Sequence, residues 1–239
     1  MKTKKSRLFS GIIVLTMALG LSLLTAPTVR AITMADLLGG LDVVIGDLSF
    51  ENWRDYVSVG TNGAQAVAPS SIFVSFSLIN PYLYEIDYQS GAMFVGANQI
   101  QDTRFVYDVR VIGKDPIKDN GLALRSFGLG STATEFDLGR VSISDTVTDA
   151  AGAFLAQKLV YDDHGVVVIS AYREWSPPVN FITVRKDIGL EGDNRQGGGA
   201  FISDFEQTYS TVPEPATMLL LGSGLIGLAG YARRRFRKN

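Results

Sequence analysis

Hydrophobic and polar residues alternate along much of the middle of this chain, which is the period of a β-strand buried on one face. Such alternation runs over residues 72–78, 105–111 and 141–143, and the polar positions, Asp108 among them, are expected to face water. A further run, Val166–Ile169, is continuously apolar and is interpreted as a central strand. The pattern predicts an all-β fold, an antiparallel β-sandwich of the jelly-roll type.

Turn-forming residues separate the predicted strands about every ten residues, as expected for a sandwich. Four segments are interpreted as turns: Asn80–Pro81, Ser90–Gly91, Asp119–Asn120–Gly121 and Asp163–His164–Gly165. The glycine-rich residues 192–199 are expected to form a loop before the last strand, and a short helix is expected around residues 33–38. Composition does not shift within residues 32–211, which are therefore interpreted as one domain.

The N-terminus has the three parts of a signal peptide. Basic residues precede an apolar stretch over residues 11–24, and short residues follow it at 26–31. We expect residues 1–31 to form an N-terminal signal helix that is removed by cleavage after Ala31.

The C-terminus carries a second apolar segment, the 17 residues 216–232, which would reach about 25 Å as a helix. A basic cluster follows it: Arg233, Arg234, Arg235, Arg237 and Lys238. Because basic residues stay on the cytoplasmic side, the pattern predicts one transmembrane helix with its N-terminal end outside the inner membrane. The glycines 222–227 fit G-x-G-x-x-G, but without a preceding strand they do not indicate nucleotide binding.

Pro213, Glu214 and Pro215, the apolar helix and the basic cluster together resemble the PEP-CTERM sorting signal, over residues 212–239. The resemblance implies that the chain is a substrate of exosortase, a membrane enzyme that processes such tails. Residues 44–53, 184–188 and 201–210 also resemble segments of PEP-CTERM proteins. The family implies an exported, β-rich protein of Gram-negative bacteria that make exopolysaccharide, and it implies neither a catalytic residue nor a cofactor.

Charge is distributed unevenly along the chain. Residues 32–212 hold 12 Lys and Arg against 23 Asp and Glu, a net charge of −11 between two basic ends. Nucleic acid is therefore not expected as a partner, since phosphate contacts need clustered basic residues. The chain has no cysteine, so neither a disulfide nor a thiol nucleophile is available.

Sequence patterns of catalysis are weak. The single histidine, His164, could form a metal corner with Asp162 and Asp163, or a serine triad, but a polar hairpin turn is the favoured interpretation. Two groups of carboxylates and amides could bind calcium if they lay in loops, and solvated loop side chains are the favoured interpretation: Asp115, Asp119, Asn120, Asp145 and Asp149. We therefore predict no metal, no cofactor and no catalytic residue.

Three functions remain open at this stage. The first is a non-enzymatic structural or adhesive protein of the envelope or extracellular matrix, anchored as a precursor in the inner membrane and then exposed at the surface. The second is a glycan-binding module that associates with exopolysaccharide, with Tyr82 and Tyr84 as an aromatic platform. The third is an envelope hydrolase, which would need a cleft with two carboxylates within reach of each other.

Overall fold

A computed structural model describes residues 32–129, 139–164, 166–194, 198–212 and 223. The predicted signal peptide with its cleavage site at Ala31, the Pro213–Pro215 motif and the basic cluster of residues 233–238 lie outside this part of the chain, as does the predicted membrane helix apart from Ser223. Among the described residues, no helix is both long and apolar enough to span a bilayer.

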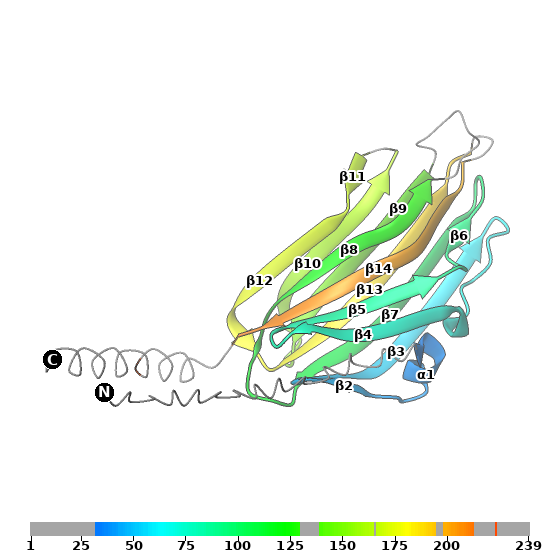
Figure 1. The fold of residues 1–239 in the computed structure, drawn as a ribbon. Helices are drawn as coiled ribbons and strands as arrows, with labels where there is room; N and C mark the ends of the chain where they lie inside the picture. Colours follow the sequence, from blue (N-terminus) through cyan, green and yellow to red (C-terminus); the bar gives the residue numbers. More distant parts are fainter. Residues whose placement is uncertain (1–31, 130–138, 165, 195–197, 213–222, 224–239) are drawn as a thin grey trace, which may run out of the picture.

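Two antiparallel sheets of seven strands pack face to face, which confirms the predicted β-sandwich, and their strands run in similar directions (Figure 1). Sheet A has the order β1-β4-β5-β14-β8-β12, with β6 paired to β14. Its strands are β1 (Ile32–Thr33), β4 (Ile72–Asn80), β5 (Leu83–Ser90), β6 (Phe94–Val95), β8 (Ile117–Leu129), β12 (Ser170–Val179) and β14 (Ala200–Thr211).

Sheet B has the order β11-β10-β9-β13-β7-β3-β2. Its strands are β2 (Val43–Ile45), β3 (Leu48–Thr61), β7 (Ile100–Val111), β9 (Gly139–Asp149), β10 (Phe154–Asp163), β11 (Val166–Val168) and β13 (Phe181–Gly192). Each sheet therefore draws strands from both halves of the chain, so most pairings are non-local.

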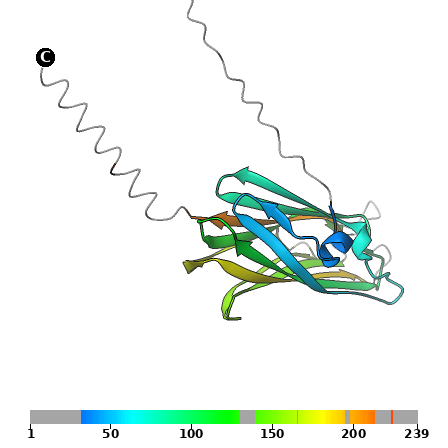
Figure 2. The same ribbon diagram turned by 90° about the horizontal axis from the view of Figure 1, so that it is seen from below.

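The expected short helix is α1 (Met34–Leu38), which lies beside β3 and β4 (Figures 1 and 2). Thr33 caps it, because its hydroxyl accepts from the Asp36 backbone while the Asp36 carboxylate accepts from the Thr33 backbone. Met34 and Leu37 are fully buried and dock the helix on the core. A 3-10 turn, η1 (Pro69–Ser71), precedes β4.

The core contains the inward residues of the alternating strands, as predicted for β7 and β9 and for β4 as far as Phe76. Aromatic rings from both sheets meet in it. Tyr88 stacks on Phe205 at 4.6 Å between centroids, and Trp53 stacks on Tyr107 at 4.3 Å. Such stacked pairs add about 0.5–1.5 kcal/mol to the burial of the rings.

Charged side chains also lie inside the core, between the sheets. Asp145 on β9 has Lys186 of β13 on one side and Lys158 of β10 on the other, and all three are 0% exposed. The Lys186 Nζ donates to Asp145 Oδ1 at 2.7 Å and to Gln207 Oε1 of sheet A at 2.8 Å. The Lys158 Nζ lies 3.2 Å from Asp145 Oδ2. We refer to Lys186, Asp145 and Lys158 as the core charge cluster.

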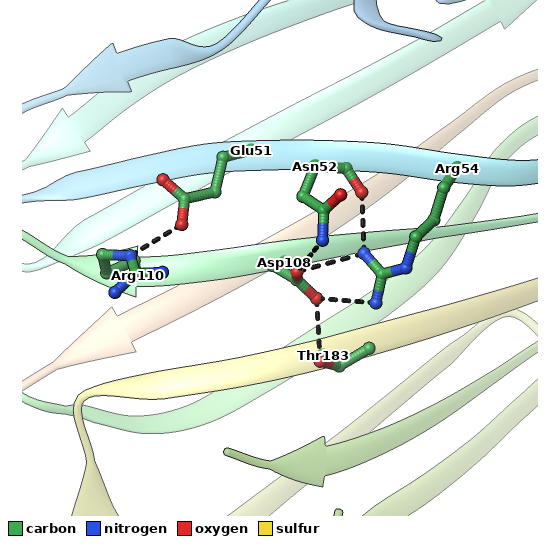
Figure 3. A network of polar contacts seen from close by, with 6 residues as sticks. All are labelled: Glu51, Asn52, Arg54, Asp108, Arg110 and Thr183. Carbon is green, nitrogen blue, oxygen red and sulfur yellow. Dashed lines mark hydrogen bonds and ion pairs between the residues drawn. The ribbon is translucent and has the colours of Figure 1, made fainter. Parts of the chain in front are cut away.

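A second polar network holds β3 against β7 and β13 on the outer face of sheet B (Figure 3). Both Nη atoms of Arg54 contact the Asp108 carboxylate at 3.0 and 3.1 Å, and the Asn52 amide and the Thr183 hydroxyl donate to the same group. Asp108 is thus only 5% exposed, contrary to the expectation that it faces water, because four hydrogen bonds replace its hydration.

Three other expectations are wrong. Val166–Val168 forms the edge strand β11 rather than a central strand, with Val166 62% exposed. Asp119–Asn120–Gly121 lies within β8 and not in a turn, and the Asp119 carboxylate accepts from the Tyr172 hydroxyl on the neighbouring strand. Asp145 is a buried strand residue and not a solvated loop carboxylate, because the two lysines compensate its charge.

We expect Asp145→Ala to lower the free energy of unfolding by about 3–5 kcal/mol, because it leaves two buried amines without a counter-charge. Asp187→Ala is the matched control, since Asp187 follows Lys186 on β13 but is exposed on the outer face, and it should change stability by no more than about 0.5 kcal/mol. Urea unfolding of both variants measures the difference, and equal midpoints would contradict this account of the core.

Candidate functional site

Carboxylates gather on the outer face of sheet A, where β5 and β14 pair. Tyr88 and Phe205 lie opposite each other and face inward, so the next pair along the ladder, Asp87 and Glu206, faces outward. Glu85 and Asp204 extend this row along the same two strands. We refer to Glu85, Asp87, Asp204 and Glu206 as the acidic face.

Burial and neighbouring carboxyl groups raise the pKa of two residues of the acidic face. Partial burial, followed by the neighbouring Asp87 carboxyl group, raises the pKa of Asp204 to about 7. Burial and the neighbouring Glu206 carboxylate likewise raise the pKa of Glu85. Arg125 on β8 forms an ion pair with Glu206 and supplies a compensating positive charge.

A hollow of about 410 Å³ adjoins the acidic face. It is lined by Phe73, Gln89, Ser90, Gly91, Ser203 and Asp204. Phe73 is 50% exposed, and the Gln89 amide donates to Asp87 at 2.9 Å. Two further exposed rings, Phe94 and Phe201, are paired across β6 and β14 on the same sheet. The hollow therefore combines an exposed aromatic side chain with hydrogen-bonding groups.

The structure does not bring the predicted tyrosine platform together. Tyr84 is 1% exposed and faces the core, where its hydroxyl accepts from the Asp47 backbone at 3.2 Å. Tyr82 is 40% exposed in the turn that precedes β5. The two residues therefore form no common platform, because Tyr84 is buried in the core and Tyr82 lies in the turn before the strand.

Sequence reasoning missed Phe73, Gln89 and Asp204. A signal for Phe73 was nonetheless present, because an aromatic residue occupies an outward position of the alternating strand 72–78. An apolar ring at a position that should be polar indicates contact with something other than water. Asp204 had no comparable signal, since its neighbour Asp87 is far away in the sequence.

His164 lies at the tip of the β10–β11 hairpin, which confirms the turn interpretation. Its side chain is 53% exposed, and its Nδ1 and Nε2 atoms lie 2.6 Å from Asp163 and 3.5 Å from Asp193. A polar hollow of about 490 Å³ adjoins it. Within the described ranges, no group of three or more His, Cys, Asp or Glu side chains is arranged to hold a metal ion.

We expect Asp204→Asn to raise the free energy of unfolding at about pH 8 and to leave it nearly unchanged near pH 4. The folded protein retains on Asp204 a proton that the unfolded chain, at an ordinary pKa of 3.8, releases. Wild-type stability should therefore fall as the pH rises from about 4 to about 7, and the variant should lose this decrease. Urea unfolding across this range tests it, with the exposed Asp42→Asn as control. Parallel curves for wild type and Asp204→Asn would contradict the retention of this proton on Asp204.

Several solved structures resemble parts of this fold at low similarity. TmCBM61 in complex with beta-1,4-galactotriose is 14% identical, with a TM-score of 0.28 over 64% of this chain and 86% of that chain. A structure of carbohydrate-binding modules from the β-sandwich superfamily is 9% identical, with a TM-score of 0.23 over 78% and 61% of the two chains. A DUF4465 family protein from Bacteroides caccae is 8% identical, with a TM-score of 0.20 over 63% and 100%. At TM-scores this low, the similarity does not indicate a ligand for this chain.

The C-terminal segment matches a known protein family. No curated protein sequence matches the chain. A family model described as the PEP-CTERM protein-sorting motif matches residues 211–235, which confirms the resemblance seen in Pro213–Pro215 and the segments after it. The chain is therefore a PEP-CTERM domain-containing protein.

Proposed function

We propose that this chain is an exported surface or matrix protein that exosortase processes at its C-terminus, and that its non-enzymatic β-sandwich adheres to extracellular polysaccharide. The sorting motif at residues 211–235 supports export through a membrane-anchored precursor. The signal peptide of residues 1–31 would begin this route, and the basic cluster of residues 233–238 would hold the precursor in the inner membrane.

The hollow beside Phe73 is the observation that carries the polysaccharide proposal. A sugar ring presents apolar C–H groups on its face and hydroxyl groups around its edge. The exposed Phe73 ring would contact the face, while Gln89, Ser90 and Asp204 would accept or donate at the edge. The carboxylates of the acidic face add charge-assisted hydrogen bonds to hydroxyl groups, which are stronger than neutral ones.

The lining of the hollow favours binding over hydrolysis in this proposal. A glycosidase places two carboxyl groups on either side of the bond that it cleaves. Among the described residues that line the hollow, only Asp204 carries a carboxyl group.

Phe73→Ala should weaken binding to the exopolysaccharide of the producing cells by at least about tenfold, because it removes the one aromatic ring of the hollow. Tyr82→Ala is the matched control, since that ring is similarly exposed but lies at the opposite end of the β4–β5 hairpin. Affinity electrophoresis of the full chain in polysaccharide gels measures both. Equal retention of the two variants, or wild-type protein that ignores the polysaccharide, would exclude this site.

The sorting proposal predicts that the surface form lacks Arg233–Lys238. Mass spectrometry of the mature C-terminus in wild-type cells should show cleavage near the motif, and Glu214→Ala should leave an intact tail in the inner-membrane fraction. Thr217→Ala, which lies in the apolar segment beyond Pro213–Pro215, should be processed like wild type. A surface form with an intact basic cluster would contradict exosortase processing.

A further inference from the structure

The core charge cluster places two amines on one carboxylate. Asp145 is the direct cross-strand partner of both Lys186 and Lys158, and all three side chains are fully buried. Each amine contacts a different oxygen: Lys186 Nζ is 2.7 Å from Oδ1, and Lys158 Nζ is 3.2 Å from Oδ2. Structural ion pairs need one cation per carboxylate, so the second lysine adds a buried charge that the pair itself does not require.

The surroundings of Lys186 hold its amine in one position. Its Nζ lies 5.5 Å from the centre of the Tyr88 ring and 5.4 Å from that of Phe205, and Gln207 Oε1 accepts from it. Burial lowers the pKa of Lys186 and lowers that of Lys158 to about 8. The amine is thus held beside the Asp145 carboxyl group, and holding two groups together in this way favours a reaction between them.

We propose that Lys186 and Asp145 condense into an intramolecular amide, an isopeptide bond that joins β13 to β9. A proton first passes from the Lys186 ammonium to Asp145 Oδ2, which gives a neutral amine and a carboxylic acid. The amine nitrogen then attacks the carboxyl carbon, a C–N bond forms, and the bond from that carbon to Oδ2 breaks. Lys158, in contact with Oδ2, donates a second proton to the leaving oxygen and regains one from the Lys186 nitrogen. The ammonium and carboxylate therefore become one amide and one water, with no oxidant or other reactant.

The product carries less buried charge than the ions do. Three buried charged groups become one, and the desolvation cost of two ions is removed. The new amide N–H would retain Gln207 Oε1 as its acceptor. The link closes a loop between residues that are 41 apart in sequence, which restricts the unfolded chain as a disulfide would. The chain has no cysteine with which to make a disulfide.

Peptide mapping of the wild-type full chain tests the bond without any variant. Trypsin does not cleave after an acylated lysine, so we expect a branched peptide that joins the segments around residues 145 and 186 and is lighter by one water than its two parts. Recovery of Lys186 and Asp145 only in unmodified linear peptides would overturn the proposal. A branch from Lys158 instead would overturn the assignment of Lys186 as the nucleophile.

Variants test the roles within the cluster. Lys186→Arg keeps the positive charge but should abolish the branched peptide, and circular dichroism of the same sample verifies that it folds. Lys158→Met should reduce the linked fraction at least tenfold at early times after synthesis, because the proton donor is lost. A Lys158→Met chain that links as fast as wild type would overturn the proton-donor role, and a link in Lys186→Arg would overturn the bond itself.

Discussion

The burial of Asp145 between two lysines is the constraint on which the rest of the sandwich depends. An isolated charge in the core would cost several kcal/mol, so Asp145 tolerates its site only if β10 and β13 lie on either side of β9 in the observed register. Gln207 on β14 accepts a hydrogen bond from Lys186, so the position of sheet A relative to sheet B also depends on this cluster. A slip of one residue in either pairing would turn a charged side chain outward and strand its partner in the core.

The functional surface follows from the same registers. Because Tyr88 and Phe205 stack inside the sandwich, Asp87 and Glu206 must project from the outer face, next to each other. Asp204 lies two positions before Glu206 on the same face, so it is a diagonal neighbour of Asp87 in the β5–β14 pairing. The acidic face is thus a by-product of core alternation at one strand pair, and the Phe73 ring beside it is the part that core packing does not explain.

Local patterns predicted what local physics determines. Alternation located the buried positions of β7 and β9, and capping chemistry located α1, because both depend on neighbours within a few residues. Asp108, Asp119 and Asp145 were interpreted incorrectly for a common reason. Each is buried against a partner that lies tens of residues away in the sequence: Arg54 for Asp108, Tyr172 for Asp119 and Lys186 for Asp145. A single sequence does not show which strands become neighbours. Val166–Ile169 failed because an apolar run does not distinguish a central strand from an exposed edge.

The C-terminal sorting motif and the stability of the β-sandwich are related, because an exported protein has to stay folded outside the cytoplasm. The sorting motif at residues 211–235 indicates a protein that is exported from the cytoplasm. Outside the cytoplasm, chaperones that use ATP are not present to refold a domain that unfolds. A sandwich of mostly non-local strand pairs folds slowly, so resistance to unfolding matters more for it than for a locally connected fold. Without cysteine, that resistance has to come from packing and from the core charge cluster. The cluster spans three adjacent strands of sheet B, β10, β9 and β13, so the separation of either neighbour from β9 would part Asp145 from one of its lysines.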